Sequence, residues 1–278
     1  MIKDKTFDEE RALYNLQNET LENCSFEGEA DGESALKESG NIKVSDSEFH
    51  LRYPLWHVET FEVADSLMSD TCRAPIWYCS NGIFSSSVLY GPKSLRECFD
   101  IKFSKCDINS VEFGWKCSGI EINDSSLESE YVFLNSKDIS LKNVEMTGKY
   151  SFQYVDNLLV ENSNLDTKDA FWHSKNILIK DSTLKGEYLA WFSENLTLIN
   201  CHIVGTQPFC YCKNLKLVNC TMEDCDFAFE KSTVEAEVNS HIDSIRRPLS
   251  GNVTALSVGE IFEDSSFDCR GNINICEK

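Results

Sequence analysis

The sequence predicts an all-β fold, a single-stranded right-handed parallel β-helix (solenoid) of about 12 to 13 coils. Three observations predict it: a period of 19 residues, apolar residues at alternate positions within each period, and small residues at fixed places between them. A repeat of this length is too short for a helix pair and is typical of stacked strands. We expect one domain over residues 1–278, with an N-terminal cap at 1–12, coils at 13–261 and a C-terminal tail or cap at 262–278.

The repeat is clearest in four segments that begin at Asn157, Asn176, Asn195 and Asn214, each 19 residues after the one before. The first and third residues after each start are apolar, which is the period of a strand with one buried face. A leucine-rich repeat would show L-x-x-L-x-L-x-x-N, and a left-handed hexapeptide helix would repeat every six residues. Neither pattern occurs, so the right-handed parallel β-helix is the fold that remains.

The charge balance argues against two classes of partner. The chain has 46 acidic and 26 basic residues and a formal net charge of −20. Such a surface repels phosphate backbones and anionic lipid, so we expect no nucleic-acid and no membrane partner. The first residues, MIKDKTFDEE, carry charges where a signal peptide needs an apolar stretch, and this predicts a cytoplasmic protein.

Cysteines are numerous, with 13 in the chain, and recur at the 19-residue spacing in two series, Cys79, Cys98 and Cys117, and Cys201 and Cys220. We interpret them as reduced, small apolar fillers of stacked interior positions. The rival interpretation is a metal site in the densest cluster, which comprises Cys210, Cys212, Cys220 and Cys225. Paired C-x-x-C knuckles are missing, so we expect no metal and no cofactor. Cys269 and Cys276 either form a disulfide or belong to the cap.

Aromatic and ionisable residues recur just before the start of each repeat, and we call this band the aromatic stripe. Its predicted ligand-binding members are Trp77, Arg96, Trp115, Lys149, Tyr150, Gln153, Lys168, Trp172, Tyr188 and Trp191. The same band includes Tyr53, Trp56 and His57 nearer the N-terminus. Sugar faces stack on such rings, so a saccharide is the expected ligand.

Acid–base chemistry on a saccharide would need carboxylates within this stripe, and the candidate catalytic residues are Asp169, Glu187 and His173. Glu187 lies diagonal to Asp169 on the next coil. Asp169 and His173 would be about 13 Å apart along a straight strand, too far to hydrogen-bond unless the chain bends. An enzyme of this kind would resemble a glycoside hydrolase, or a lyase or epimerase.

A structural alternative explains the same residues without chemistry. Coils place residues 19 apart in contact, so opposite charges such as Lys93 and Glu112, or Lys168 and Glu187, form ion-pair ladders. The second hypothesis is therefore a non-catalytic scaffold for protein interaction or self-association, with a homo-oligomer as the expected partner.

Several strings resemble a bacterial domain family of unknown function that belongs with the pectin-lyase-like right-handed β-helices. They are Glu10–Tyr14, Asp31–Lys37, Leu51–His57, Cys72–Tyr78, Gly148–Tyr154, Asp169–His173 and Gly205–Cys212. The resemblance covers almost the whole chain. It implies the fold and a bacterial source, and it carries no activity to transfer.

The motifs of better-known enzymes with this fold do not occur in order. A polygalacturonase-like pattern needs Asn-Thr-Asp, Asp-Asp, Gly-His-Gly and Arg-x-Lys. Residues 166–169 resemble part of this pattern only loosely. The Arg-x-Pro-x-x-Arg of pectate lyases and the Asp-Phe-Ile-Phe-Gly of pectin methylesterases are absent. A fold alone does not confer a reaction.

Overall fold

The computed structural model of the chain describes residues 1–265 and 267–276. It confirms an all-β parallel solenoid of the right-handed type, with about 14 turns and a period of about 19 residues. Residues 1–265 and 267–276 contain no α-helix, and hence no helix that could span a membrane. Residues 266, 277 and 278 of the predicted C-terminal tail lie outside the described residues.

The chain divides into two compact units, Met1–Ser140 and Leu141–Lys278, which we call the N-terminal and C-terminal units. The strands of the N-terminal unit are β1 (Ile2–Lys3), β2 (Thr6–Phe7), β3 (Thr20–Glu22), β4 (Ser25–Phe26), β5 (Gly40–Ser45), β6 (Glu48–Phe49), β7 (Leu55–Trp56), β8 (Glu59–Ala64), β9 (Leu67–Met68), β10 (Ile76–Trp77), β11 (Ser80–Ser85), β12 (Val88–Leu89), β13 (Leu95–Arg96), β14 (Phe99–Ser104), β15 (Asp107–Asn109), β16 (Glu112–Trp115), β17 (Ser118–Ser129) and β18 (Tyr131–Val132).

The C-terminal unit follows the same plan with longer strands. Its strands are β19 (Lys137–Lys149), which begins before the division, β20 (Asp156–Glu161), β21 (Asn164–Lys168), β22 (Lys175–Lys180), β23 (Thr183–Lys185), β24 (Glu194–Ile199), β25 (His202–Val204), β26 (Lys213–Glu223), β27 (Thr233–Arg246), β28 (Ser250–Phe262) and β29 (Asn272–Ile275).

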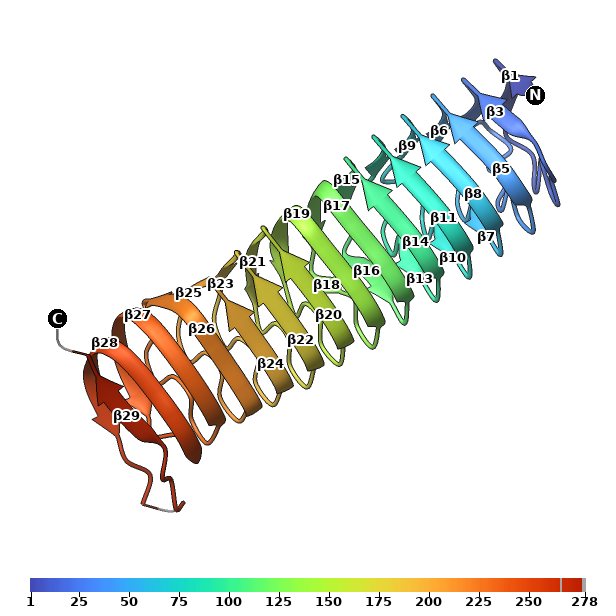
Figure 1. Ribbon diagram of the computed structural model, residues 1–278. Coiled ribbons are helices and arrows are strands. Elements are labelled where there is room, and N and C mark those ends of the chain that lie inside the picture. Colours follow the sequence, from blue (N-terminus) through green and yellow to red (C-terminus); the bar gives the residue numbers. More distant parts are fainter. Residues whose placement is uncertain (266, 277–278) are drawn as a thin grey trace. The chain divides into compact units, whose positions relative to one another are not determined.

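Strands of successive turns pair in parallel, as Figure 1 shows for β5, β8, β11 and β14. Residues 19 apart face each other: Phe84 pairs with Phe103, and Ile177 pairs with Leu196. The prediction that equivalent residues of neighbouring turns lie directly over one another is therefore confirmed. Most of the aromatic stripe in the N-terminal unit lies on a second, five-stranded sheet of β7, β10, β13, β16 and β18.

The ends of the chain extend the ladder. Within residues 1–12, β1 pairs with β3 so that Ile2 faces Leu21, and β2 pairs with β4. Near the other end, β29 pairs with β28, with Asn252 opposite Asn272. The predicted cap segments thus contain strands of the solenoid itself.

Stacked apolar side chains fill the interior of each unit. In the N-terminal unit, Phe26 and Phe49 are fully buried, with ring centroids 4.5 Å apart and an interplanar angle of 4°. Cysteine and serine share the small interior positions and hydrogen-bond along the stack, as where Cys79 N donates to Cys98 Sγ at 3.4 Å. All 13 cysteines are free, so Cys269 and Cys276 form no disulfide. No group of metal-ligating side chains occurs among the described residues.

The asparagines that begin each repeat have a structural reason. Asn176, Asn195 and Asn214 have φ values of 55–58°, a left-handed conformation that asparagine tolerates better than most residues. Their side chains form a ladder, in which Asn214 Nδ2 donates to Asn195 Oδ1 at 2.9 Å and Asn195 Nδ2 to Asn176 Oδ1 at 3.0 Å. The repeat start is therefore a corner of the coil.

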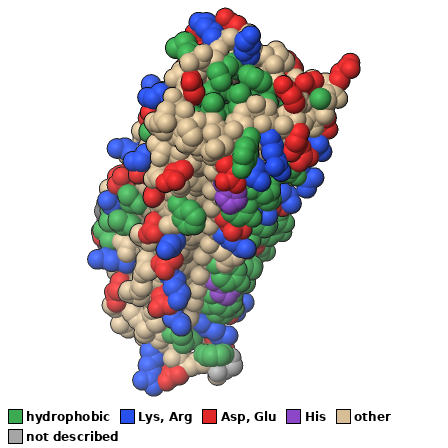
Figure 2. All heavy atoms as spheres, turned by 90° about the vertical axis from the view of Figure 1, so that its right-hand side faces the viewer, with side chains coloured by type: hydrophobic (Ala, Val, Ile, Leu, Met, Phe, Trp, Pro, Cys, Tyr) green, Lys and Arg blue, Asp and Glu red, His purple; other side chains and the backbone are tan. Residues whose placement is uncertain are grey.

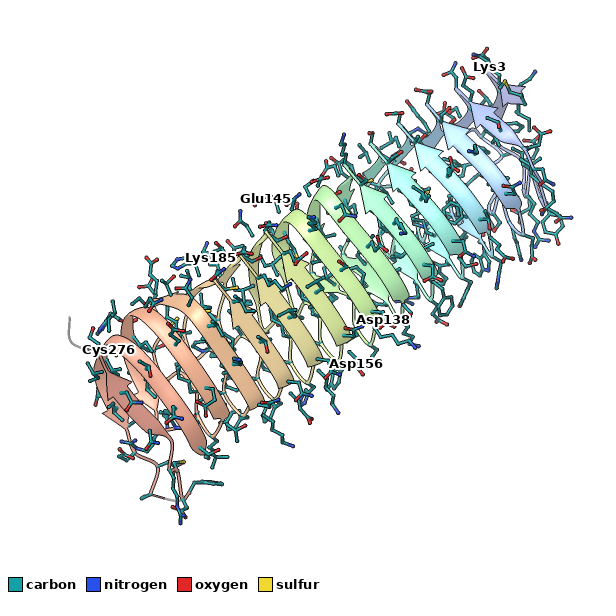
Figure 3. The ribbon with its side chains drawn as sticks, in the orientation of Figure 1. Lys3, Asp138, Glu145, Asp156, Lys185 and Cys276 are labelled. Atoms are coloured by element: carbon teal, nitrogen blue, oxygen red, sulfur yellow. The ribbon has the colours of Figure 1, made fainter. Side chains whose placement is uncertain are left out.

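Charged side chains project outward and pair along the stack. On the face that Figure 2 shows, acidic and basic groups are interspersed, and hydrophobic side chains gather mainly along one side. In the C-terminal unit, Glu145 and Lys185 point away from the coils (Figure 3) and reach neighbours one turn away. Asn164 Nδ2 donates to Glu145 Oε1 at 2.7 Å, and Lys185 Nζ lies 2.7 Å from Asp166 Oδ2.

Candidate functional site

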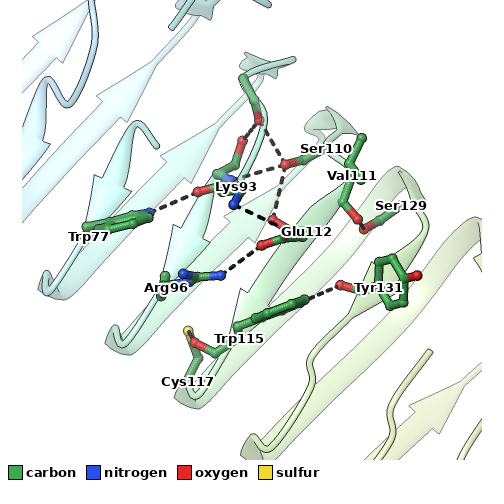
Figure 4. Close-up of polar contacts among 12 residues, drawn as sticks. Trp77, Lys93, Arg96, Ser110, Val111, Glu112, Trp115, Cys117, Ser129 and Tyr131 are labelled. Carbon is green, nitrogen blue, oxygen red and sulfur yellow. Dashed lines mark hydrogen bonds and ion pairs between the residues drawn. The ribbon is translucent and has the colours of Figure 1, made fainter. Parts of the chain in front are cut away.

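In the N-terminal unit, Arg96 lies in the middle of the aromatic stripe (Figure 4). Its guanidinium carbon is 5.1 Å from the Trp77 ring centroid and 4.8 Å from that of Trp115, a double cation–π contact. Arg96 Nη2 also lies 2.8 Å from Glu112 Oε2, and Lys93 Nζ lies 3.5 Å from Glu112 Oε1. The predicted Lys93–Glu112 pair is confirmed, and the guanidinium is enclosed by partners of this chain.

The indole N–H groups of the stripe are used inside the chain. Trp77 Nε1 donates to the carbonyl oxygen of Lys93 at 3.0 Å, and Trp115 Nε1 donates to that of Tyr131 at 2.9 Å (Figure 4). Each bond joins residues 16 apart and fixes the ring against the next turn. A ligand here would meet the faces and edges of these rings rather than their N–H groups.

A pocket of about 280 Å³ lies where the stripe approaches the N-terminus. Three aromatic rings line it and are inclined to one another: Tyr53 and Trp56 at 80°, Trp56 and Trp77 at 45°. Because the rings are inclined, they form the wall of a hollow rather than a parallel stack. The other lining residues are Glu10, Arg11, Glu33, Ser34 and Lys37.

Stacked loops of successive turns build this pocket. Arg11 N donates to the carbonyl oxygen of Glu33, Ser34 N to that of Arg52, and Tyr53 N to that of Arg73. Ser34 and Tyr53 have positive φ values of 60° and 57°. These loops therefore turn sharply at the pocket wall, and each places two or three polar or aromatic side chains there.

The register also changes beside this pocket. Phe7 pairs with Phe26, which is 19 residues later, whereas Gln17 pairs with Gly40, which is 23 residues later. The additional residues therefore enter the turn between these two pairs, next to Glu33 and Ser34. This local insertion makes the wall of the pocket different from the regular turns that follow it.

In the C-terminal unit the stripe is a set of closed stacks. Trp172 and Trp191 have centroids 5.5 Å apart and an interplanar angle of 6°. Their Nε1 groups donate to the carbonyl oxygens of Tyr188 at 2.7 Å and Gln207 at 2.8 Å. Gln153 occupies the equivalent position one turn earlier, and its Nε2 donates to the carbonyl oxygen of Asp169 at 3.2 Å.

A second stack runs beside the first through Tyr154, His173, Phe192 and Tyr211. Successive ring centroids are 5.0, 5.0 and 4.8 Å apart, with interplanar angles of 7–9°. The inner rings, His173 and Phe192, therefore have both faces covered, although Phe192 is 45% exposed, and Tyr154 at the end of the stack is 52% exposed. Solvent meets mainly the edges of these rings, and a sugar cannot stack on faces that neighbouring rings already occupy.

The candidate acid–base residues are only partly brought together. Asp169 N donates to the carbonyl oxygen of Glu187 at 2.9 Å, so the two lie on adjacent turns. Partial burial raises the pKa of the Asp169 carboxyl, Lys168 opposes this rise, and the negative Glu187 adds to it. His173 is held in its ring stack, and no hydrogen bond or ion pair of the described residues joins it to either carboxylate.

The remaining predicted residues lie close to these groups. Lys149 Nζ is 5.5 Å from the Tyr150 ring centroid, and Tyr188 packs edge-on against Trp191 at 5.4 Å. Sequence reasoning included Trp77 but left Lys37, Ser34 and Arg11 out of the predicted site. The sequence did contain a signal for this pocket, because four strings that carry the family resemblance contribute lining residues. These strings are Glu10–Tyr14, Asp31–Lys37, Leu51–His57 and Cys72–Tyr78.

One protein family matches the chain over residues 1–276, and its description is protein of unknown function, DUF3737. The chain belongs to this family. The resemblance seen in the sequence is thus confirmed, and so is its lack of an assigned activity. No curated protein matches the chain.

Several solved structures are similar to this chain at very low identity. A surface adhesin of Streptococcus pneumoniae, PfbA, has 7% identity and a TM-score of 0.48, and the match covers 88% of this chain and 83% of the adhesin. A tailspike protein of E. coli bacteriophage HK620, solved with a hexasaccharide, has 10% identity and a TM-score of 0.46, covering 89% and 60%. A mannuronic acid-specific family 6 lyase from human gut microbiota has 7% identity and a TM-score of 0.40, covering 94% and 83%.

Proposed function

We propose that this protein binds a saccharide in the pocket lined by Tyr53, Trp56 and Trp77. The observation that carries the proposal is the inclination of these three rings around a hollow of about 280 Å³. Aromatic faces bordering a pocket accept the apolar face of a sugar, and a few polar groups fix its hydroxyls. The carboxylates of Glu10 and Glu33 and the hydroxyl of Ser34 supply such groups.

The stripe of the C-terminal unit supports this function less well. The Trp172–Trp191 stack and the stack through His173 and Phe192 turn ring faces toward one another. Such stacks stabilise neighbouring turns, as the structural alternative expects. Inclined rings occur in both regions, as at Tyr188 and Trp191, and those at Tyr53, Trp56 and Trp77 also line a pocket.

The size of the pocket limits the ligand. Ligand sites in proteins usually measure about 300–1,000 Å³, so this pocket lies near the small end of that range. A short oligosaccharide, or one end of a longer chain, fits it better than an extended polymer segment does. Binding, with no chemical step, is the whole of this proposal.

Acid–base chemistry at Asp169 and Glu187 is a second candidate function, which one observation favours. The raised pKa of Asp169 next to a second carboxylate is the pattern of a group that holds a proton for transfer. Lys168 opposes the rise, and His173 is not positioned to assist. This candidate therefore ranks below saccharide binding.

The test is an oligosaccharide array with neutral, acidic and sulfated members, followed by calorimetric titration of the best ligand. Trp56→Ala should weaken binding by about tenfold or more, as expected when an aromatic anchor is removed. Tyr154→Ala is the matched control, because it removes an exposed aromatic side chain that does not line the pocket. Equal affinity of the wild type and Trp56→Ala, in a variant with an unchanged circular dichroism spectrum, would contradict the proposal.

A further inference from the structure

The charged groups of the aromatic pocket are unequally partnered. Its lining contains the carboxylates of Glu10 and Glu33 and the cations of Arg11 and Lys37. Some of these charges are already neutralised by other residues of this chain. Only the remaining ones can pair with a charged ligand.

Both carboxylates already have partners. Arg11 Nε lies 3.4 Å from Glu10 Oε1, and Glu10 Oε2 accepts a hydrogen bond from the backbone N of Glu33 at 2.7 Å. Arg52, which is not part of the lining, places Nη2 2.9 Å from Glu33 Oε1 and also pairs with Asp31. The two acids are thus held by arginines, and Arg11 is engaged as well.

Lys37 is the exception. Its Nζ lies 5.9 Å from the centroid of the Trp56 ring, and its side chain is half-buried. No carboxylate of residues 1–265 or 267–276 forms an ion pair with it, whereas most other pocket charges are paired. The pocket therefore presents one positive charge beside the face of an aromatic ring.

We propose that Lys37 binds the anionic group of an acidic saccharide, a carboxylate or a sulfate, while the sugar ring packs on Trp56. This inference rests on the proposed saccharide pocket and names its ligand class. An ammonium group donates up to three hydrogen bonds, and bonds to an ionised acceptor are stronger than neutral ones. Partial burial reduces the screening of this charge by solvent and salt.

The selectivity follows from the same geometry. A neutral sugar on Trp56 would leave the Lys37 ammonium without an anionic partner and would gain only ring contacts. An acidic sugar would pair with it, and the surrounding acids of this chain would not compete, because arginines hold them. The net charge of the protein opposes the approach of anions, so the preference must arise locally at Lys37.

The experiment compares three matched disaccharides by calorimetry: cellobiose, cellobiouronic acid, in which a carboxylate replaces a hydroxymethyl group, and cellobiose 6-sulfate. The wild type should bind at least one acidic disaccharide about tenfold more tightly than cellobiose, and 0.5 M salt should reduce that preference. Preference for the carboxylate or for the sulfate identifies which anion the site takes.

Three variants locate the effect. Lys37→Gln should bind all three disaccharides with nearly equal affinity, while Lys37→Arg, which retains the charge, should keep the preference. Lys5→Gln removes an exposed lysine of the same unit that does not line the pocket, and it should behave as the wild type. A preference that survives Lys37→Gln would overturn the inference.

Failure of this inference is distinguishable from failure of the proposed function. If cellobiose binds the wild type as tightly as its acidic analogues and Trp56→Ala abolishes that binding, the pocket stands and the role of Lys37 is wrong. If none of the disaccharides or array members binds the wild type, both proposals are overturned.

Discussion

The orientation of single aromatic residues distinguishes the proposed ligand-binding positions of this protein from those explained by packing alone. Trp172 is parallel to Trp191 at 6°, so these two rings cover each other. Trp56 and Trp77 meet at 45°, and both rings line a pocket. The residue type is the same in all four. The 19-residue repeat aligns Trp77, Trp172 and Trp191, and strand pairing aligns Trp56 with Trp77. The roles that we propose for them differ because Trp56 and Trp77 line a pocket, whereas Trp172 and Trp191 stack on each other.

At the scale of single residues, the sequence predicts positions but not side-chain orientations. The repeat correctly places Trp77, Arg96 and Trp115 on neighbouring turns, but it does not specify the tilt of a ring. Nor does it identify Lys37 as a pocket residue, because Lys37 follows the local insertion that breaks the regular spacing. Side-chain orientation and loop stacking are tertiary properties, and no periodicity reports them.

Asp169 provides a residue-scale prediction about pH. Its pKa is raised above the ordinary value of 3.8, mainly by burial, so the folded chain holds the proton more tightly than the unfolded chain. The Asp169 carboxyl therefore destabilises the fold as pH rises from about 3.8 through the raised pKa, and this effect is complete at neutral pH.

Asp169→Asn should consequently raise the melting temperature relative to the wild type at pH 7, and this gain should disappear at pH 3. Thermal melts of both proteins at the two pH values measure it. The matched control is Asp166→Asn, which alters an exposed carboxylate paired with Lys185 and should not raise the melting temperature. A gain for Asp169→Asn that is equal at both pH values would show that burial of the charge is not its cause.

At the scale of elements, side chains of paired strands in neighbouring turns pack into the same interior volume. On β11, Gly82 faces Phe61 of β8 on one side and Ile101 of β14 on the other. A Cβ atom on Gly82 would lie 2.2 Å from Phe61 Cζ, so the phenyl ring fills the volume that a side chain would need. The glycine at this apolar position of the repeat is thus complementary to the large residue one turn earlier.

Gly82→Ala should destabilise the protein by about 1–3 kcal/mol through overpacking. In a Phe61→Leu background the same substitution should cost clearly less, because leucine lacks the Cζ atom that the new methyl group meets. Urea unfolding of the four proteins in this double-mutant cycle measures the coupling, expected at about 0.5–3 kcal/mol. Equal costs in both backgrounds would show that the two positions do not share this space.

The elements themselves are the part of the fold that sequence predicts best. Apolar residues at alternate positions, such as Leu196 and Leu198, identify the buried face, and the 19-residue spacing identifies their partners Ile177 and Ile179. Asparagine at the repeat start marks the corner, although its side-chain ladder was not predicted from the pattern. These features are local or strictly periodic, so a linear sequence contains them.

At the scale of the whole molecule, membership of a family of unknown function leaves activity to be derived from the site. A parallel β-solenoid supplies stacked positions along its turns, and most of its charged and aromatic ladders need no ligand to explain them. The alternative hypothesis of a self-associating scaffold stays a prediction, as does the expected cytoplasmic location. What distinguishes the proposed site is a pocket at which the regular ladder is interrupted.

The most direct test uses the five tryptophans of the chain as reporters. The protein would be labelled with 5-fluorotryptophan, each resonance assigned by substitution, and the fluorine spectrum recorded during titration with the best array ligand. We predict shifts at Trp56 and Trp77, with the resonances of Trp172 and Trp191 unchanged. Shifts at Trp172 and Trp191 with Trp56 and Trp77 unmoved would contradict a saccharide pocket in the N-terminal unit.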